Sequence, residues 1–307
     1  MSIDGLNMTV WAKQLQANLN KIHVFADRSV TNRKYEGELE EGGKVKINSI
    51  GRITVKDYTR NAGAGNTAAS PTIAGIDRPE ILQASAMWLE ATEQKYFNFE
   101  IDDIDKAMQT PDIMTDAMRE AAYAIKNTID LFVASTIQTG VAGTADATGN
   151  RLSARTIGTG LGDDSAYEAL VALKVKLDEN DVPDVARWCA VPPWFHGNLL
   201  LDGRFTNYGT PANRENLKNG SVGEAAGFLI KLSNNLSGST SGTLAVAGGV
   251  YTVLAGVADA CTFGETIASL KPFEPQDGFN HAIKGLHVYG AKVTRPYALA
   301  SVACTAA

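Results

Sequence analysis

The sequence has few cysteines and few aromatic residues. Its three cysteines, Cys189, Cys261 and Cys304, are far apart, and no Cys-x-x-Cys pair occurs. This spacing argues against a structural zinc site and a disulfide framework, so we expect three free, buried thiols. Aromatic residues make up 7% of the chain, whereas 29 glycines are present. That mixture favours strands and irregular loops over a helical bundle.

A long hydrophobic run is also missing. The longest mainly apolar stretch, residues 245–258, is interrupted by Gly248, Gly249 and Gly256. It is shorter than the roughly 18 residues that a membrane span requires. Residues 1–11 lack the basic-then-apolar order of a signal peptide. We therefore expect no membrane segment and no export signal.

The chain has no excess of basic residues. Of its 307 residues, 28 are Lys or Arg and 34 are Asp or Glu, which gives a net charge of −6. A histone-like DNA binder needs the opposite balance, and an acidic chain repels nucleic acid at long range. The 44% hydrophobic and 20% charged content is that of a folded globular protein. The length allows one large domain or two ordinary ones.

Common catalytic motifs are absent. The sequence contains no Gly-x-Ser-x-Gly elbow, no phosphate-binding Gly-x-x-x-x-Gly-Lys-Ser/Thr loop and no Gly-x-Gly-x-x-Gly fingerprint. We therefore assign no catalytic, cofactor-binding or metal-binding residue, and we expect no cofactor. The four histidines also lack a metal-binding spacing: they are His23, His196, His281 and His287.

One acidic group leaves a remote alternative open. Asp102, Asp103 and Asp105 follow a predicted strand at 96–101. Three carboxylates in such a place can hold magnesium or calcium, which would make the chain a metal-dependent enzyme. The glycine and the distal glutamate of a calcium loop are missing, however. The nearby Thr110-Pro111 favours a solvated turn between a strand and a helix.

A charged extended segment follows a short N-terminal helix. Residues 9–20 have the apolar spacing of an amphipathic helix, which at about twelve residues is marginal alone and needs a partner surface. Residues 44–50 and 52–58 alternate polar and apolar side chains around Gly51, which predicts a strand pair or one long bent strand. Residues 61–75 offer almost nothing for a core, so we expect a projecting charged hairpin.

The charges of this hairpin suggest contacts with a neighbouring subunit. Acidic residues gather before the strands and basic residues within them, on a segment with too little apolar surface to fold alone. Our hypothesis is that the basic strands lie across an adjacent subunit and meet acidic side chains there. The candidate contact residues are Glu36, Glu38, Glu40, Glu41, Lys44, Lys46, Arg52, Lys56 and Arg60.

The clearest helix begins after Thr110, its predicted N-cap, with Pro111 at the first helical position. It ends near Gly140 after about 28 residues, which corresponds to a rod of about 42 Å. A helix of this length usually organises a domain. Its apolar stripe comprises Met114, Met118, Ala121, Ile125, Ile129, Phe132 and Ile137.

The second half of the chain alternates short strands and helices. Ser165 and Glu168 predict a capping box at the start of a helix, after a loop at 141–161. The other predicted elements are the rest of that helix to about 179, a strand at 185–191, a helical turn at 194–201, a helix or turn at 220–230, a loop at 233–242, one or two strands at 243–257, a helical turn at 279–284 that Gly285 ends, and strands at 286–295 and 297–304.

Six short segments, spread over nearly the whole chain, are informative together. They are RKYEGEL at 33–39, GKVKI at 43–47, ITVKDY at 53–58, KYFNFEIDDID at 95–105, VPP at 191–193 and GLHVYGAKVTRP at 285–296. With the order of arm helix, charged hairpin, long helix, α/β insertion and closing strands, they resemble the major capsid proteins of tailed bacteriophages with the Hong Kong 97-type fold. The nearest branch is the podovirus-type coat protein family.

The resemblance implies an α+β fold of four parts. The long helix would be the spine helix of a peripheral domain, and the charged hairpin would be an extended E-loop. The implied parts are an N-terminal arm at 1–34, the E-loop at 35–80, the peripheral domain at 81–144 and 286–307, and an axial α/β domain at 145–285.

The function that the resemblance implies is that of a major capsid protein. Such a protein self-assembles as hexamers and pentamers into an icosahedral shell around a double-stranded DNA phage genome. The resemblance also implies scaffolding and portal proteins as partners, DNA enclosed without sequence-specific binding, assembly in the host cytoplasm and a final location in the virion. The alternative is an encapsulin-like nanocompartment shell protein. Neither function is that of an enzyme.

Overall fold

The computed structural model of the chain describes residues 24–50, 53, 55, 84–102, 113–143, 149–158, 162–202, 223–236, 249–275 and 280–307. The amphipathic helix predicted at 9–20 lies outside these residues. The chain divides into two compact units. The smaller unit is Lys46–Trp88, and the larger comprises Met1–Val45 and Leu89–Ala307.

A two-stranded sheet is formed by β1 (Lys44–Ile50) and β2 (Ala84–Glu90), and most of it belongs to the smaller unit. The alternation predicted for β1 is confirmed, because Val45 and Ile47 are buried and the residues between and beside them are exposed. One side of β1 is thus covered within the chain itself, although the sequence suggested too little apolar surface for that.

Within the described residues, β1 pairs with β2 and not with the second alternating run, at 52–58. Ile53 and Val55, the described residues of this run, are outside any strand and are 66% and 94% exposed. The prediction that the two runs form a strand pair or one bent strand is therefore wrong where the chain is described. An alternating pattern in the sequence does not identify which strand pairs with β1, whereas a candidate strand with a buried side chain is favoured as its partner. β2 supplies one, since its Leu89 is fully buried.

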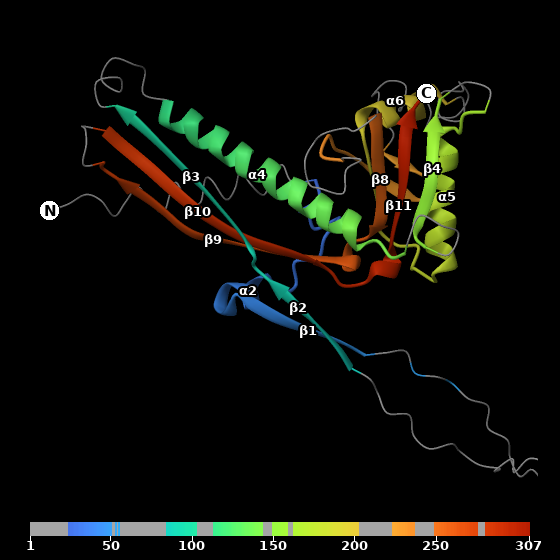
Figure 1. Ribbon diagram of the computed structural model, residues 1–307, viewed down its shortest axis with the longest axis horizontal. Helices are drawn as coiled ribbons and strands as arrows, with labels where there is room; N and C mark the ends of the chain where they lie inside the picture. The colour runs from blue at the N-terminus through green and yellow to red at the C-terminus, as the bar shows by residue number, and fades with distance from the viewer. Residues whose placement is uncertain are drawn as a thin grey trace, which may run out of the picture. The chain divides into compact units, whose positions relative to one another are not determined.

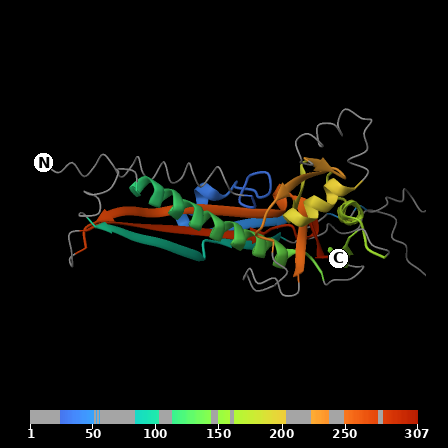
Figure 2. The same ribbon diagram turned by 90° about the horizontal axis from the view of Figure 1, so that it is seen from above.

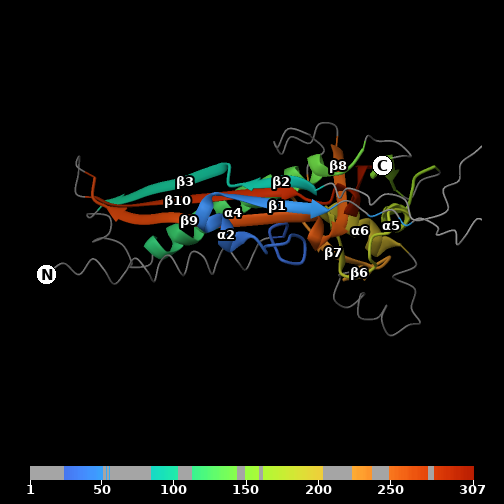
Figure 3. The ribbon, with the colours of Figure 1, turned by 90° about the horizontal axis from the view of Figure 1, so that it is seen from below.

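Three strands form the first sheet of the larger unit, which we call the long sheet. In spatial order they are β3 (Glu93–Asp102), β10 (Asn280–Val293) and β9 (Cys261–Phe273). β10 is antiparallel to both neighbours. Figure 3 shows the three strands side by side. Helix α4 (Ile113–Gly140) runs along this sheet and packs on β10 (Figures 1 and 2).

Helix α4 confirms the predicted long helix. It has 28 residues, which corresponds to a length of about 42 Å. At its last residue, Gly140, a Cβ would lie 2.4 Å from Cγ2 of Val293, so only glycine lets β10 come this close. One face of the helix is apolar and enters the core. Four residues of that face, each one turn apart, are buried: Ile125, Ile129, Val133 and Ile137.

The second sheet of the larger unit has six strands, and we call it the mixed sheet (Figure 1). In spatial order its strands are β4 (Arg151–Ile157), β11 (Leu299–Ala306), β8 (Val250–Val257), β5 (Arg187–Val191), β7 (Phe228–Leu232) and β6 (Glu224–Ala225). β4 is parallel to β11 and β5 is parallel to β7, while the other pairs are antiparallel. Helix α5 (Ala166–Glu179) packs on β11 and β4, and α6 (Pro193–Leu201) packs on α5.

Local signals fix where α5 and α6 begin. Ser165 Oγ accepts a hydrogen bond from the backbone N–H of Glu168, and the Glu168 carboxylate accepts one from the N–H of Ser165, both at 3.2 Å. This is the predicted capping box. Pro193 occupies the first position of α6, where its missing N–H costs nothing.

Asn150 ties the end of α4 to the mixed sheet. Its side-chain amide donates to the carbonyl oxygens of Tyr297 at 2.9 Å and Leu299 at 2.8 Å, and its oxygen accepts from Asn180 at 2.8 Å. Its backbone N–H donates to Ala142. Asn150 is 6% exposed, so these bonds form in a low-dielectric interior, where they are stronger than in water.

The helical turn predicted at 279–284 is wrong, because β10 begins at Asn280 and continues as one strand through Gly285. Gly285 does not end a helix. It lies opposite Phe97 of β3, where a Cβ would be 2.3 Å from a carbon of the ring. The glycine is therefore needed for packing between strands.

Three further segments differ from the predictions. Residues 141–161 contain β4, a half-exposed edge strand without a clear apolar pattern. The described residues of 220–230 form no helix: β6 and β7 are a hairpin whose turn residues Ala226 and Gly227 both have positive φ, as in a type I′ turn. β9, which no pattern indicated, is held by pairing with β10 and by contact with helix α2 (Glu36–Gly42).

The expected division into parts also changes. Residues 24–34 were expected in the arm, but Phe25, Ala26 and Val30 are fully buried in the core of the larger unit. β9, expected in the axial domain, pairs in the long sheet, and β11, expected in the peripheral domain, pairs in the mixed sheet. Strand pairing determines to which sheet β9 and β11 belong. A division of the sequence into consecutive segments does not show which strands pair.

The three cysteines are free and buried, as predicted. Burial raises the pKa of Cys261 to about 12 and that of Cys304 to about 12. Burial, with Cys304 close by, also raises the pKa of Cys189. The thiolate is the reactive form of cysteine, so these side chains are inert at neutral pH.

Replacing Ile125 with Asp tests the buried face of α4. An unpaired charge in the core costs about 3–5 kcal/mol, so Ile125→Asp is expected to prevent stable folding. Thr128→Asp, on the exposed side of the same helix, is the control and should change stability by about 0.5 kcal/mol or less. Urea unfolding followed by circular dichroism measures both. A folded Ile125→Asp chain with parental stability would contradict the packing.

Alkylation tests the thiols. Because the raised pKa values keep the thiolate scarce, iodoacetamide at pH 8 is expected to label none of the three cysteines in the native protein. All three should be labelled in 6 M guanidinium, which is the control. Mass spectrometry of proteolytic peptides gives the answer, and a labelled native cysteine or a disulfide would contradict the prediction.

Candidate functional site

The residues considered for metal or acid–base chemistry are described only in part. Asp102 is the last residue of β3, and Asp103 and Asp105 lie outside the described residues. Within the described part of the chain, no group of three or more His, Cys, Asp or Glu residues is placed to hold a metal ion. The histidines are likewise divided between elements, with His196 in α6 and His281 and His287 in β10.

The acidic contact candidates lie on a helix rather than on projecting strands. Glu36, Glu38, Glu40 and Glu41 all fall within α2. Acidic residues in the first turn suit the positive end of the helix dipole. The helix is held in place by buried Leu39, which fills the space above the missing side chain of Gly264 in β9. This part of the expected hairpin is therefore packed within the larger unit.

Two of these acidic side chains are described, and they differ in their contacts. Glu36 pairs with Arg33 of the same chain at 3.3 Å, whereas Glu38 is exposed. The side chains of Glu40 and Glu41 lie outside the described residues. Within the described set, Glu38 is the acidic candidate most accessible to another molecule.

The basic candidates begin on β1. Lys44 pairs with Glu90 of the same chain at 3.0 Å, in an exposed position. Lys46 Nζ lies 6.0 Å from the ring centroid of Trp88, a cation–π arrangement within the smaller unit. Arg52, Lys56 and Arg60 lie outside the described residues. Lys44 thus forms an ion pair within its own chain, and Lys46 lies near the ring of Trp88.

Several apolar side chains are exposed, which the charge pattern of the sequence did not indicate. In the smaller unit, Ile53, Val55 and Trp88 are 66%, 94% and 52% exposed. On the larger unit, Tyr96 of β3 is 79% exposed and Val185 is 73% exposed. Apolar surface that gathers in contiguous patches marks interaction sites. The available sequence signal was the apolar half of the alternating run at 53–58, in a segment without a core.

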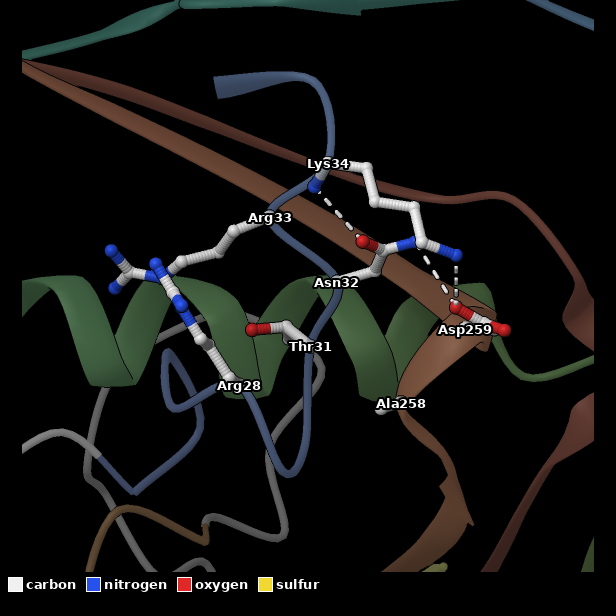
Figure 4. A pocket seen from close by; sticks show the side chains of 7 residues that line it. All are labelled: Arg28, Thr31, Asn32, Arg33, Lys34, Ala258 and Asp259. Carbon is white, nitrogen blue, oxygen red and sulfur yellow. Dashed lines mark hydrogen bonds and ion pairs between the residues drawn. The ribbon is translucent and has the colours of Figure 1, made fainter. Parts of the chain in front are cut away.

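A pocket of about 420 Å³ lies between the chain before α2 and the start of β9. Figure 4 shows the side chains of Lys34 and Asn32 pointing at the carboxylate of Asp259, at 3.3 Å and 3.1 Å. The pocket is lined by three basic residues, Arg28, Arg33 and Lys34. Lys34 pairs with Asp259, and Arg33 pairs with Glu36 and Glu265. The ion pairs and hydrogen bonds at this pocket fasten two parts of the chain together.

Comparison with solved structures identifies the fold. The chain matches one from Mycobacterium phage Che8 with a TM-score of 0.67 and 24% identity, over 92% of this chain and 91% of that one. It matches a capsid structure of the cyanophage P-SCSP1u with a TM-score of 0.65 and 17% identity, over 94% and 89%. It matches a chain of the mature capsid of bacteriophage PhiM1 with a TM-score of 0.61 and 17% identity, over 87% of this chain and 83% of that one. The Hong Kong 97-type fold inferred from the sequence is confirmed.

Sequence comparison gives the family. No curated protein matches the chain at a significant level. None of the helices in the described residues is both long and apolar enough to cross a membrane. Residues 88–302 match the sequence model of a family described as phage capsid protein. Because this match covers well over half of the sequence, the chain belongs to the phage capsid protein family, whose members are structural proteins rather than enzymes.

Proposed function

We propose that the chain is the major capsid protein of a tailed phage and builds an icosahedral shell around double-stranded DNA. The observation that carries this proposal is the capsid family match over residues 88–302, joined by a structural match that spans about nine-tenths of both chains. The encapsulin-like alternative has less support, because the matching family is one of phage capsid proteins.

The surfaces of the molecule support assembly. Ile53, Val55 and Trp88 expose apolar surface on the smaller unit, and Ile47 is the buried residue among those of this unit whose side chains are described. A two-stranded sheet is at best marginally stable alone in water. Copies of the chain would gain stability by covering these side chains. We therefore infer that the smaller unit, the counterpart of the expected E-loop, is completed by a neighbouring copy.

The partners follow from this function. The chain would assemble with itself as hexamers and pentamers, with scaffolding and portal proteins, in the host cytoplasm, and would end in the virion. Its net charge of −6 suits a shell that encloses DNA without sequence-specific binding, because a strongly basic lining would grip the genome. The division into arm, E-loop, peripheral and axial domains is carried over with the changed strand memberships described above.

The proposed function predicts closed shells. The purified chain, alone or expressed with its scaffolding protein, is expected to form particles of uniform diameter in electron micrographs. Uniform shells would be absent for a monomeric enzyme. The contents of particles from infected cells provide the second measurement, since a virion holds double-stranded DNA and a nanocompartment holds a cargo enzyme.

The basic residues of the smaller unit are expected to act as an electrostatic clasp on the neighbouring copy. Each exposed ion pair contributes only about 0.2–1 kcal/mol, but the contact is repeated at every subunit. Lys46→Glu, Arg52→Glu and Lys56→Glu together should leave a folded monomer that does not form shells. Lys44 is omitted because it pairs with Glu90 in its own chain.

A charge-conserving triple variant is the matched control. Lys46→Arg, Arg52→Lys and Lys56→Arg should assemble like the parent. Light scattering over a range of salt concentrations should show weaker assembly of the parent as the Debye length falls below about 8–10 Å. Normal assembly of the charge-reversed triple, with unchanged salt dependence, would show that the clasp does not exist.

A further inference from the structure

Three of the described residues other than glycine have a positive φ: Asp181 at 55°, Ala186 at 52° and Ala226 at 52°. Left-handed backbone is unfavourable for a residue with a Cβ, and alanine has no polar side chain to compensate for it. All three lie at one corner of the mixed sheet. We define this corner as the loop of residues 180–186, between α5 and β5, with the turn at Ala226 and Gly227, between β6 and β7.

The two segments of the corner lie close together. β5 and β7 are parallel neighbours, so they start at the same end of the sheet. A Cβ on Gly227 would lie 3.2 Å from Nζ of Lys174 on α5 and 3.8 Å from Oδ1 of Asp184 in the loop. Unfavourable backbone conformations are therefore concentrated at one place. Such conformations persist only where the surrounding structure holds them, and they gather at functional sites.

Arg187 holds the loop in its conformation. Its side chain is buried, and Nε donates to the carbonyl oxygen of Pro183 at 3.1 Å. Nη2 donates to the carbonyl oxygen of Val182. Nη1 lies 2.7 Å from a carboxylate oxygen of Asp178 and 3.5 Å from one of Asp184. One guanidinium group thus binds three consecutive residues of the loop and the end of α5.

Val185 is the large apolar residue that this loop exposes. It is 73% exposed, although the sequence predicted it as the first residue of a strand. Ala186, in the left-handed conformation, separates it from Arg187, at which β5 begins. The arrangement holds an apolar side chain at the surface of a fixed loop. It buries little within the chain, whereas it suits contact with another molecule.

The apolar surface continues from the loop onto α5. Val171 and Val175 are 37% and 49% exposed and lie one turn apart on this helix. Each lies three residues before a side chain that binds the loop or Arg187, namely Lys174 and Asp178. Residues three apart are neighbours on a helix surface. The two valines therefore extend the apolar surface of the corner.

A second exposed apolar side chain lies at the opposite end of the mixed sheet. β5 runs from the corner to Val191 and leads through Pro192 into α6. Figure 1 shows α6 at that far end. Leu201, the last residue of α6, is 73% exposed. Among the described residues of the mixed sheet, its loops and its two helices, Val185 and Leu201 are the most exposed large apolar side chains.

We propose that copies of the chain join head to tail, with Val185 at the corner of one copy docked on Leu201 at the α6 end of the next. This inference rests on the proposed function and names two surfaces that would form the ring. A contact between two different surfaces is heterologous, and it generates a ring when the rotation between copies closes. Contact between two Val185 side chains would instead be isologous and would end at a dimer.

The charges of the corner favour a second copy as the partner. Lys174 pairs with Asp184 at 3.8 Å, and Arg187 pairs with Asp178. Since both cations already have carboxylate partners, they do not select a polyanion such as DNA. Recognition then depends on apolar contact, for which the other end of the same chain supplies Leu201.

Cross-linking is the first test. A chain carrying both Val185→Cys and Leu201→Cys is assembled into shells, oxidised mildly and separated on a gel without reductant. The native cysteines are buried, so they do not interfere. The double variant is expected to give a ladder of linked chains that ends at the pentamer and the hexamer and that collapses to the monomer with reductant.

The two single variants are the matched controls. Val185→Cys alone and Leu201→Cys alone should remain monomeric on the gel, because a head-to-tail contact brings the two different positions together. A double variant that assembles but is not linked would overturn the proposal. Dimers of Val185→Cys alone would also overturn it, because they would show an isologous contact.

Replacement of the exposed valine is the second test. Val185→Asp should leave the circular dichroism spectrum and the urea midpoint of the unassembled chain unchanged, because the side chain is exposed. The protein concentration at which shells form should rise at least about tenfold, because an apolar contact is lost from every copy. Val185→Ile, which keeps the apolar surface, should assemble like the parent. Assembly of Val185→Asp at the parental concentration would contradict the contact.

The proposed function and this contact fail in different ways. A parent chain that forms no shells, even with its scaffolding protein, would refute the function and the contact together. Parent shells in which the double cysteine variant is not linked would overturn the contact alone.

Discussion

Strand β10 is paired along both edges, with β3 on one side and β9 on the other, and α4 packs on it. Much of the larger unit depends on how closely these neighbours approach. A Cβ on Gly285 would be 2.3 Å from the Phe97 ring, and one on Gly290 would be 2.1 Å from the carbonyl oxygen of Glu90. A side chain at position 285 would require the Phe97 ring to move, whereas one at position 290 would collide with the backbone of Glu90, so Gly290 is a steric condition for the close approach of β10 to the chain just before β3.

The same strand connects the two sheets. β10 leads through the short helix η3 (Pro296–Ala298) into β11, just as β8 leads through η2 (Ala258–Ala260) into β9. Backbone N–H groups of Thr294 and Arg295 both donate to the carbonyl of Ala260, so these two connections are fastened together. With Asn150 bridging α4 and η3, the long sheet and the mixed sheet share one core.

Function in such a protein resides in surfaces that are incomplete in one copy. Among the described residues no group of His, Cys, Asp or Glu is placed to hold a metal ion, and Arg33 and Lys34 of the pocket pair with carboxylates of the same chain. Exposed apolar side chains include Ile53 and Val55 in the smaller unit and Tyr96 on the edge strand β3. An edge strand presents unpaired backbone groups as well.

Part of the candidate site was predictable from the sequence and part was not. The alternation of Val45 and Ile47 in β1 is local, and the sequence identified it. The helix α2 was missed because Leu39 is the one buried residue among its described side chains, and Leu39 is covered through its contact with Gly264 in β9, which is far away in the sequence. The hydrogen bonds that the Asp130 carboxylate accepts from the backbone of Val24 and Ala26 were equally hidden, since nothing near Asp130 in the sequence points to these residues. Such contacts depend on residues that are distant along the chain.

The sequence by itself determined α4 from a sustained apolar period, the start of α5 from its capping box, the free thiols from their spacing, and the capsid family from ordered short segments. These signals are local, because each is set by residues within a few turns of one another. Only the tertiary structure decided that 280–293 is one strand, that β9 and β4 exist, that β11 belongs to the mixed sheet and that residues 24–34 lie in the core. The physical reason is that a strand is stabilised by hydrogen bonds and side chains from a partner elsewhere in the chain, and local sequence does not name that partner.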